Sequence, residues 1–424
     1  LFRSEVGSGA VLDLKRIRTD PDGVRAALQR RGDASLLDRV LELDVRRREI
    51  LPRQEGLRAE QNRVGQEIAA AKQRGEDAEP ILARMREVAA EVKALGEELA
   101  KVEEELQTAL RQLPNLPDPT APPEDTVIRE VGDATKTGRD HLELAGERID
   151  MERGARVAGS RFAYLRGDIA RLELALVSWA MDLLRERGFE PVIPPVLVRE
   201  EALFGTGFWP DTEQQIYRLA DDDLFLAGTS EVALASLHAG EIIDADRLPL
   251  RYAGFSSCFR REAGAAGRDT RGIFRVHQFD KVEMFSFVRP DESVDEHERL
   301  LSIQEEILQQ LGIPYRVVNI AVDDLGASAA KKYDCEAWLP GQGRYRELTS
   351  TSNTTDFQAR RLDIRWRPEG GKPETLHTLN GTAIAVGRTI IALLENGQRD
   401  DGTIVLPECL RAYGMPESLP AAAA

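Results

Sequence analysis

Residues 255–288 read FSSCFRREAGAAGRDTRGIFRVHQFDKVEMFSFV. Two runs rich in aromatic and β-branched residues flank a glycine-rich segment, Ala263–Gly272, which is typical of two antiparallel strands joined by a long loop. Side chains along a strand alternate between its faces, so Arg275, Phe279 and Glu283 share one face of the second strand. The stretch therefore predicts a long β-hairpin with charged and aromatic side chains in one row.

Such a row can bind an extended ligand. At about 3.3 Å per residue, the row from Arg275 to Glu283 spans about 26 Å. A phosphate could lie near Arg275, an aromatic base near Phe279 and an ammonium group near Glu283. On the first strand, Arg260 and Glu262 also share a face. Taken alone, the hairpin could also be an exposed strand face on which charged residues and one aromatic residue occur by chance. Other motifs are needed to choose between a binding site and a plain surface.

Three further polar clusters accompany the hairpin. The first is GTSE at 228–231, and the second is RELTSTSN at 346–353, which is rich in small hydroxyl side chains. The third, HTLNGTAIAVGR at 377–388, predicts a strand that runs into an apolar helix, with Arg388 near the helix N-terminus, where anions are stabilised. Each cluster alone also reads as a turn, a cap or an element boundary. The chain has no GxxxxGK[ST] phosphate loop, so a bound nucleotide would need another cradle.

The rest of the C-terminal part mixes helical and strand patterns. The spacing of apolar residues predicts helices at 170–187, 292–312 and 384–396. It predicts strands at 191–198, 250–261, 273–288, 314–322 and 345–352.

The N-terminal part has a different pattern. Residues 36–113 are rich in charge and repeat apolar residues at helical spacing. A turn signal at Lys72–Asp77 divides the stretch, so we expect two antiparallel helices of about 35 residues, each about 50 Å long. Pro52 lies inside the first helix and is expected to kink it. The apolar seam comprises Leu43, Ile50, Leu57, Val64, Ile68, Ile81, Met85, Val88, Val92, Leu95, Leu99, Val102, Leu106, Ala109 and Leu113.

Charge is distributed unevenly along the chain. The whole sequence has 57 basic and 73 acidic residues and a net charge of −16, which argues against a general nucleic-acid coat. Residues 31–75 have ten basic and eight acidic side chains, a sum of +2. This pattern fits a solvated helix face, and it also fits a projecting finger that contacts phosphates.

Composition limits the class of protein. A chain of 424 residues, 42% of them apolar, suggests two to four folded domains. No stretch approaches the roughly 18 apolar residues of a spanning helix, and no secretory signal pattern is present, so we expect no membrane contact. Cys258, Cys335 and Cys409 are far apart and odd in number, which disfavours a disulfide framework and a CxxC-type zinc site. We therefore expect a cytoplasmic protein without zinc.

Five prolines within residues 113–124 mark a stiff linker between domains. The opening residues 1–10 read LFRSEVGSGA, and we expect them to be a remnant of cloning. The expected division is 11–113 for a helical arm, 114–126 for the linker, 127–415 for a mixed second domain and 416–424 for a tail.

These motifs, in this order, resemble those of one family. The chain resembles a bacterial-type seryl-tRNA synthetase, a class II aminoacyl-tRNA synthetase, from Val11 to about Gly414. Four independent motifs in register make the resemblance specific. It rests on the helical arm and on the stretches TSE, FRREAG, FRVHQFDKVEMF, RELTSTSNTTDFQARR, TLNGTAIAVGRTIIALLENGQ and DGTIVLPECLRAYG.

The resemblance implies an α+β fold. Residues 127–415 would form an antiparallel-sheet class II synthetase catalytic domain, and the N-terminal all-α part would form a long antiparallel coiled-coil hairpin arm. GFEPVIPPVL at 188–197 would be class II motif 1, which packs across the two-fold axis of a homodimer. The hairpin would be motif 2, and the strand and helix at 377–396 would be motif 3.

The resemblance also implies an activity. A seryl-tRNA synthetase uses ATP and Mg²⁺ to activate L-serine as seryl-adenylate, and it transfers serine to the 3′ end of tRNA(Ser), with tRNA(Sec) as an expected second substrate. The arm would hold the long variable arm of the tRNA through the basic residues Arg58, Arg63, Lys72 and Arg74. We expect a cytoplasmic homodimer that binds no zinc.

Site residues follow from the matching motif positions. The resemblance implies catalytic roles for Arg260 at the α-phosphate, Arg275 at the γ-phosphate and Arg388, which would enclose the adenine with Phe279. The expected serine-binding residues are Thr229, Ser230, Glu231, Glu283, Asn380 and Thr382. The expected ATP-binding residues are Arg260, Arg261, Glu262, Arg275, Val276, Phe279, Glu347, Leu348, Thr349, Ser350 and Arg388. Glu347 and Ser350 would also hold Mg²⁺.

Other functions stay open on the sequence. The same motifs would occur in a paralogue that provides activated serine to antibiotic biosynthesis, and in a resistant duplicate of the housekeeping enzyme. An RNA-binding relic that uses only the arm is disfavoured, because Arg260, Arg275, Glu283 and Arg388 are all present. A relative that aminoacylates carrier proteins is disfavoured by the long arm.

Overall fold

The computed structural model divides into two compact units, with the boundary between residues 116 and 117. The expected linker, 114–126, spans this boundary. The expected cloning remnant, residues 1–10, lies outside the described residues. The structure describes residues 14–75, 77, 79–210, 213–263, 269 and 271–422, and of residues 71, 72 and 213 it describes the backbone alone.

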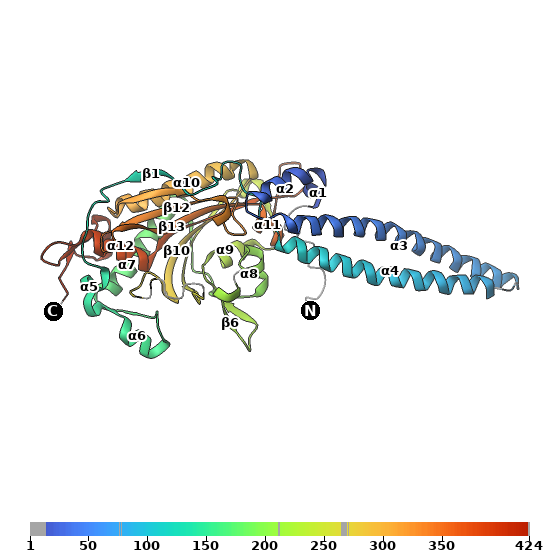
Figure 1. Cartoon of the computed structure of the whole chain (residues 1–424), viewed down its shortest axis with the longest axis horizontal. Helices are drawn as coiled ribbons and strands as arrows, with labels where there is room; N and C mark the ends of the chain where they lie inside the picture. The colour runs from blue at the N-terminus through green and yellow to red at the C-terminus, as the bar shows by residue number, and fades with distance from the viewer. Residues whose placement is uncertain are drawn as a thin grey trace. The chain divides into compact units, whose positions relative to one another are not determined.

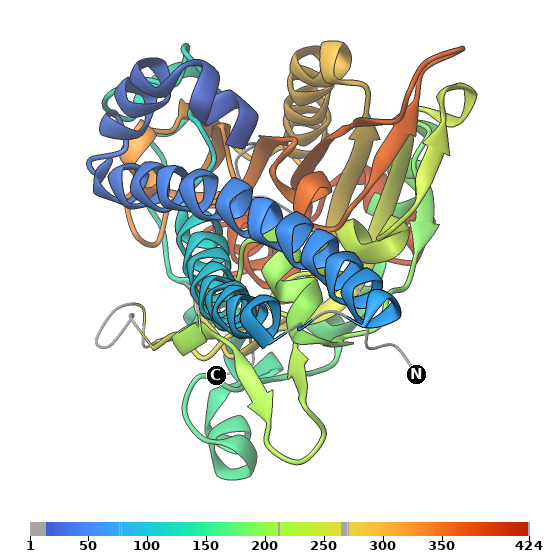
Figure 2. The same cartoon turned by 90° about the vertical axis from the view of Figure 1, so that its right-hand side faces the viewer.

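The described part of the first unit is helical. Two short helices, α1 (Leu14–Thr19) and α2 (Pro21–Gln29), precede two long ones, α3 (Ser35–Arg74) and α4 (Glu79–Gln112). The carboxylate of Asp20 caps α2 by accepting a hydrogen bond from the backbone N–H three residues later, at 2.9 Å. Figures 1 and 2 both show α3 and α4 side by side, so the expected helical hairpin is confirmed.

Apolar burial holds α3 and α4 together. Each fully buried aliphatic side chain contributes about 1.5–3 kcal/mol to stability. α3 continues as a helix through Pro52, which faces solvent. The buried members of the seam are Leu43, Ile50 and Val64 on α3, Val88, Leu95, Leu99, Val102, Leu106 and Ala109 on α4, and Leu113 directly after α4.

Arginines of α3 pair with glutamates of α4. Arg47 Nε lies 2.9 Å from Glu103 Oε1, and both side chains are partly exposed. Exposed ion pairs of this kind contribute about 0–1 kcal/mol each, so the apolar seam contributes more to the stability of the hairpin. The same arrangement recurs in Arg39–Glu105, Arg46–Glu98 and Arg53–Glu91.

The described part of the second unit is built on an eight-stranded sheet (Figure 1). The strand order is β1-β11-β12-β13-β16-β10-β9-β4, and neighbours are antiparallel except β4 and β9. The expected antiparallel-sheet domain of an α+β fold is therefore confirmed. The strands are β1 (Thr126–Val131), β4 (Glu190–Val192), β9 (Leu250–Phe259), β10 (Gln278–Val288), β11 (Tyr315–Asn319), β12 (Lys331–Leu339), β13 (Arg344–Thr355) and β16 (His377–Ala385).

The central hairpin is shorter than its sequence pattern indicates. We expect strands at 250–261 and 273–288, but β9 ends at Phe259 and β10 begins at Gln278. One further backbone hydrogen bond, from the Arg260 N–H to the His277 carbonyl at 2.9 Å, continues the pairing. The next N–H groups make tertiary contacts, from His277 to Arg161 at 3.2 Å and from Arg261 to Gln215 at 2.8 Å. Such contacts commonly override the intrinsic preference of a segment for strand.

Arg260, Glu262 and Arg275 therefore lie outside the two strands. The prediction that they share strand faces is wrong, because the backbone N–H of Arg261 donates to the carbonyl of Gln215 at 2.8 Å and not to β10. Glu262 has a φ of +50°, in the left-handed region, so the chain turns sharply there. These residues reach the interior from loop segments.

β10 separates two sides of the interior. Val282, Met284 and Val288 pack in the main core with α7, α10 and α12. Phe285 and Phe287 face the other side and pack against the short helices α9 and α11. This alternation is that of a regular strand, so the second side also receives the odd-numbered polar residues of β10. The helices are α7 (Asp168–Glu186), α9 (Glu231–Ala235), α10 (Ser293–Gln310), α11 (Phe357–Arg361) and α12 (Val386–Gly397).

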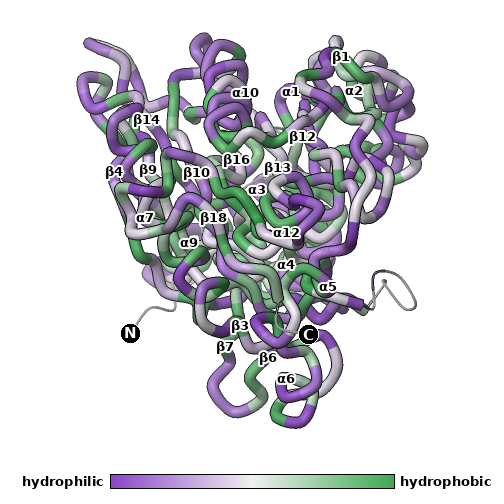
Figure 3. The backbone as a smooth tube through the Cα atoms, turned by 90° about the vertical axis from the view of Figure 1, so that its left-hand side faces the viewer, coloured by the Kyte–Doolittle hydropathy of each residue, from purple (hydrophilic) through white to green (hydrophobic). Residues whose placement is uncertain are grey.

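Shorter elements surround the sheet. In Figure 3, hydrophobic stretches lie mainly within the sheet and the helices packed on it. Among the described helices, none combines the length and the apolar character needed to cross a membrane. Besides short 3-10 helices, the remaining described elements are α5 (His141–Ala145), α6 (Met151–Ala158), α8 (Glu200–Thr206), β2 (Ile149–Asp150), β3 (Tyr164–Leu165), β5 (Leu197–Val198), β6 (Tyr217–Leu219), β7 (Leu224–Leu226), β8 (Ile242–Asp244), β14 (Arg365–Arg367), β15 (Glu374–Thr375), β17 (Ile404–Val405) and β18 (Ser418–Leu419).

Candidate active site

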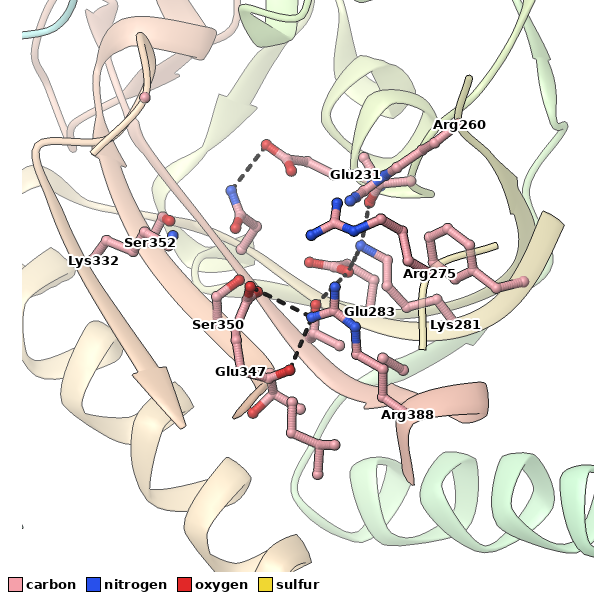
Figure 4. Close-up of a pocket in the computed structure, with 18 of the residues that line it drawn as sticks. Glu231, Arg260, Arg275, Lys281, Glu283, Lys332, Glu347, Ser350, Ser352 and Arg388 are labelled. Atoms are coloured by element: carbon pink, nitrogen blue, oxygen red, sulfur yellow. Dashed lines mark hydrogen bonds and ion pairs between the residues drawn. The ribbon is translucent and has the colours of Figure 1, made fainter. Parts of the chain in front are cut away.

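A cavity of about 410 Å³ lies on the α9 side of the sheet. Its described lining residues all belong to the second unit. Figure 4 shows Arg260, Arg275 and Arg388 reaching towards its middle from different elements. Most of the predicted site residues line it together: Thr229, Glu231, Arg260, Glu262, Arg275, Val276, Phe279, Glu283, Glu347, Leu348, Thr349, Ser350, Asn380, Thr382 and Arg388.

Two of the residues predicted to bind serine or ATP lie outside the cavity wall. Ser230 is buried, and its hydroxyl donates to the Gly254 carbonyl at 3.4 Å. The side chain of Arg261 is exposed. Neither residue is part of the described cavity wall.

A β-bulge brings Glu347 and Ser350 to the same wall. Residues three apart on a regular strand face opposite sides of the sheet. On β13, Glu347 and Thr349 pair with consecutive residues of β12, so Leu348 is an additional residue. The bulge changes the alternation of the strand, and side chains on both sides of it line the cavity.

Glu231 provides a buried carboxyl group. Its Oε1 accepts hydrogen bonds from Gln358 Nε2 at 2.7 Å and from Asn380 Nδ2 at 2.9 Å. Burial and the nearby Glu283 carboxylate raise the pKa of Glu231 to about 7. A cationic group that enters the cavity would favour the ionised form of Glu231.

Lys281 places a buried ammonium group beside the same carboxylates. It forms an ion pair with Glu283, and its Nζ donates to Thr229 Oγ1 at 2.6 Å. Thr229 Oγ1 also accepts the Glu231 N–H at 3.2 Å, so its own proton remains available for an acceptor on a ligand. Thr382 Oγ1 donates to Glu283 Oε2 at 3.3 Å. This part of the cavity therefore combines two carboxyl groups, one ammonium group and two hydroxyl groups.

Arg260 and Arg275 are held by partners from different segments. Arg260 Nε donates to the Gly228 carbonyl at 3.1 Å, and its guanidinium carbon lies 5.4 Å from the centre of the Phe279 ring. Arg275 Nη1 donates to Glu262 Oε2 at 2.8 Å. These contacts orient the cationic groups before any ligand binds, which lowers the entropic cost of binding an anion.

Arg388 lies in the first turn of α12 and contacts β13. Its Nη1 donates to the Glu347 carbonyl at 2.9 Å and lies 3.4 Å from Glu347 Oε2. Its guanidinium carbon is 4.6 Å from the centre of the Phe274 ring. Partial desolvation raises the pKa of Glu347, but the positive charges of Arg388, Lys332 and Arg260 lower it by more in sum, so its pKa is below its usual value. The Glu347 carboxyl group is therefore ionised at neutral pH.

Arg346, on β13, connects that strand to the loop of the hairpin. Arg346 makes a bidentate ion pair with Asp269, at 3.0 and 2.7 Å. Its guanidinium carbon lies 3.7 Å from the centre of the Phe274 ring. Phe274 therefore contacts two guanidinium groups, those of Arg346 and Arg388.

Sequence reasoning missed thirteen of the described wall residues, among them Lys281, Phe274 and Lys332. The alternation rule could have found Lys281, since it lies midway between Phe279 and Glu283 on one strand face. Phe274 lies before β10, and Lys332 lies on β12, which the pattern did not indicate. For these two, the sequence carries no local signal.

The fold and the cavity define a class II aminoacyl-tRNA synthetase. Residues 215–397 match the family model described as the tRNA synthetase class II core domain (G, H, P, S and T). Residues 11–117 match the model described as the seryl-tRNA synthetase N-terminal domain. The first match covers the cavity-bearing sheet, and the second covers the helical hairpin.

Comparison with individual proteins narrows the class to one family. The chain is 53% identical over 414 residues to the serine–tRNA ligase of Thermobifida fusca, covering 95% of this chain and 97% of that protein. It is 52% identical over 416 residues to the serine–tRNA ligase of Streptomyces coelicolor, with the same coverage of 95% and 97%. The chain belongs to the seryl-tRNA synthetase family, and it is therefore an enzyme, an aminoacyl-tRNA ligase.

A solved structure supports the same assignment. The crystal structure of seryl-tRNA synthetase from Pyrococcus horikoshii complexed with ATP is similar to this chain with a TM-score of 0.92. The two sequences are 42% identical, and the similarity covers 97% of this chain and 100% of that one.

Proposed function

We propose that this protein is a serine–tRNA ligase, which uses ATP to activate L-serine as seryl-adenylate and transfers serine to the 3′ end of tRNA(Ser). One observation carries the proposal: the carboxyl groups of Glu231 and Glu283 and the guanidinium groups of Arg260, Arg275 and Arg388 face one cavity. The relatives at about half identity support serine as the amino acid. The solved relative complexed with ATP supports ATP as the nucleotide.

The serine pocket is assigned to the carboxylate end of the cavity. Glu283 and Glu231 would bind the ammonium group of serine, and the free Thr229 proton suits an oxygen of the substrate. Asn380 and Thr382 would lie near the serine hydroxyl, with Ser230 contributing through its backbone. Alanine would leave buried polar groups unpaired, at a cost of about 1–3 kcal/mol for each group, so it should be rejected.

The arginines suit the first chemical step. A carboxylate oxygen of serine forms a bond to the α-phosphorus of ATP while the bond from that phosphorus to pyrophosphate breaks. Arg260 at the α-phosphate and Arg275 at the γ-phosphate would stabilise the negative charge of the transition state. The attacking carboxylate is already ionised at neutral pH, so the step depends on positioning and needs no side chain as nucleophile.

The adenine is assigned to the aromatic part of the cavity. Phe279 and Arg388 would enclose the ring, and Phe274 lies under the Arg388 guanidinium. Val276 and Leu348 line the same cavity. The remaining residues assigned to ATP binding are Arg261, Glu262 and Thr349.

Mg²⁺ fits the donors on β13. The Glu347 carboxylate and the Ser350 hydroxyl line the cavity together, and a magnesium ion prefers hard oxygen ligands of this kind. Bound there with ATP, the ion would neutralise phosphate charge. Arg388, which pairs with Glu347, would keep that carboxylate ionised and oriented.

The helical arm is assigned to the tRNA. Arg58 is exposed and makes no ion pair with any described residue, whereas Arg63 lies 3.8 Å from Glu67. Such residues can pair with phosphates, and each contact would release counterions. Arg74 and Lys72, whose side chain lies outside the described residues, complete the proposed contact set.

We assign the protein as a cytoplasmic homodimer. In the stretch that resembles motif 1, residues 188–197, the side chain of Ile193 is 81% exposed, which supports burial against a second copy. All three cysteines are free, and two of them are buried, which suits a reducing compartment.

Pyrophosphate exchange with each amino acid is the direct test. We expect ATP–pyrophosphate exchange to depend on serine and to be far slower with threonine, alanine and cysteine. Charging of tRNA(Ser) with labelled serine tests the second step. Equal exchange rates with serine and alanine would refute the pocket assignment.

A further inference from the structure

His141 is a buried imidazole outside the assigned site, and its hydrogen bonds fix its protonation state. Its Nε2 accepts the backbone N–H of Ile273 at 3.3 Å, and its Nδ1 lies 3.3 Å from Glu395 Oε1. A backbone N–H can only donate, so Nε2 carries no proton and Nδ1 donates to Glu395. The imidazole is therefore neutral, with a defined tautomer and a partner on each side.

Glu395 connects His141 to the helix that carries Arg388. It is buried on α12, and its carboxylate also accepts the backbone N–H groups of His141 at 3.2 Å and Gly341 at 2.8 Å. Arg388 precedes Glu395 on α12 by seven residues, which is two helical turns, so the two side chains lie on one face of the helix. A rigid helix thus links His141 to a cavity residue.

On its other side, His141 contacts the end of the hairpin loop. A Cβ on Gly272 would lie 2.2 Å from His141 Nε2, and Gly272 has a φ of +79°, so only glycine fits there. The neighbouring Asp140 and Arg271 form an ion pair at 3.2 Å. Asp140 and His141, at the start of α5, therefore contact the three consecutive loop residues Arg271, Gly272 and Ile273.

The anchored loop leads directly into the nucleotide part of the cavity. Ile273 is followed by Phe274, which lies under Arg388, and by Arg275, which is assigned to the γ-phosphate. The Ile273 carbonyl is packed against Gly387, where an added Cβ would lie 3.4 Å from it. The Ile273 N–H is thus held by His141, and the Ile273 carbonyl lies close to the start of α12.

We propose that neutral His141 is a positioning residue for ATP: it joins the Ile273 N–H to Glu395 and thereby fixes Phe274 and Arg275 relative to Arg388. This inference rests on the proposed function for the roles of the two arginines. His141 is not part of the described cavity wall, so it is not assigned a part in bond making. Loss of its hydrogen bond to Ile273 displaces cationic groups that must meet the triphosphate, and a displacement of about 1 Å can reduce a rate by about 10²-fold.

Two substitutions separate the two hydrogen bonds. In His141→Gln, the amide oxygen replaces Nε2 as the acceptor for Ile273, whereas in His141→Asn the shorter amide replaces Nδ1 and leaves Ile273 without an acceptor. We expect His141→Asn to raise KM for ATP by about tenfold or more, with KM for serine nearly unchanged. His141→Gln, which keeps the bond to Ile273 and loses the one to Glu395, should raise KM for ATP by less.

His238→Asn is the matched control. His238 is also a buried imidazole with a partner on each nitrogen, Glu241 and Tyr252, but none of these three residues lines the cavity. We expect this variant to lose thermal stability without any change in KM for ATP. If His141→Asn does not fold, Gly272→Ala displaces the imidazole from the loop side and should raise KM for ATP in the same way.

Two outcomes would overturn the inference. One is a folded His141→Asn or Gly272→Ala variant with KM for ATP within twofold of wild type, and the other is an equal rise in KM for ATP and for serine. Affinity for a non-hydrolysable ATP analogue, measured by calorimetry without amino acid, keeps the inference separate from the proposed function. Wild-type protein that binds the analogue but shows no serine-dependent exchange would refute the proposed function alone.

Discussion

Ion pairs occur on the helical arm and in the cavity, but in opposite surroundings. On the arm, the side chains of Arg47 and Glu103 are 32% and 44% exposed. In the cavity, the side chains of Lys281 and Glu283 are 7% and 3% exposed. Solvent screens the first pair, whereas the second pair has little solvent around it.

The difference determines how each region tolerates change. An exposed charge that loses its partner is rehydrated, so the surface pair contributes about 0–1 kcal/mol. A buried charge that loses its partner stays buried, and the loss costs about 3–5 kcal/mol. Charges on the arm can therefore exchange internal partners for the phosphates of a large ligand, whereas charges in the cavity act as one connected group.

Deletion of residues 45–105, with the helix ends rejoined by a short turn, is the strongest test of this division. We expect serine-dependent pyrophosphate exchange to stay near wild type, because every described residue of the cavity wall lies in the second unit. Transfer to tRNA should fall by about 10³-fold or more, because the proposed phosphate contacts are lost. Exchange and charging kinetics of one preparation measure both effects.

The matched control neutralises Arg58, Arg63, Lys72 and Arg74 without shortening the arm. It should reduce charging by less than the deletion does, and it should lower the salt dependence of tRNA binding by about one unit for each lost contact. A deletion variant that charges tRNA at wild-type kcat/KM would show that the arm does not bind tRNA. If exchange also collapsed, the arm would instead be needed for folding or dimerisation.

Replacement of Arg260 tests whether one charged group of the cavity is needed for the first chemical step. We expect Arg260→Ala to lower pyrophosphate exchange by about 10²-fold or more, the loss typical when one transition-state donor is removed. Serine affinity should change little, because Arg260 is assigned to the α-phosphate. The exposed Arg367 provides a control of the same residue type, and Arg367→Ala should exchange at the wild-type rate. Near-normal exchange in Arg260→Ala would exclude contact with the α-phosphate.

Substitution of one partner in each ion pair compares the two regions directly. We expect Lys281→Met to lower the free energy of unfolding by about 3 kcal/mol, because Glu283 then loses its ion-pair partner in a buried site beside Glu231. Arg47→Met on the arm should lower it by less than about 1 kcal/mol. Urea denaturation of both variants gives the two values, and equal values would remove the distinction between the regions.

The sequence predicts those features of the fold that depend on local spacing. The seam of α3 and α4 and the turn between them follow from periodicity, because each apolar residue repeats within one or two helical turns. The β9–β10 hairpin follows from its glycine-rich loop and flanking runs. The ends of those strands do not follow, since the hydrogen bond from Arg261 to Gln215 joins segments far apart in the chain.

The candidate site shows the same limit. Motif positions identify Arg260, Glu283 and Arg388, all of which line the cavity. They do not identify His141, because its contact with Glu395 spans 254 residues and leaves no pattern in either segment. A residue that touches the ligand can be recognised by its motif, whereas a residue that positions it depends on packing between distant segments.

The pH dependence of serine binding gives the smallest expected effect. The pKa of Glu231 is raised from 4.5 to about 7, by burial first and by Glu283 second. Below pH 7 most Glu231 side chains are therefore protonated, and they must release that proton to bind the ammonium group of serine as a carboxylate. KM for serine should rise as the pH falls from about 8 to about 6, at most about tenfold per pH unit below the pKa.

Two comparisons make this result specific to Glu231. Glu231→Gln should bind serine more weakly at every pH and lose the pH dependence, since an amide does not titrate in this range. KM for ATP, measured on the same samples, should show no matching trend, because Glu231 is assigned to the serine end of the cavity. A wild-type KM for serine that stays constant from about pH 6 to about pH 8 would show that serine binding does not depend on the ionisation of Glu231. A KM that instead rises with increasing pH would mean that Glu231 binds serine as a neutral acid.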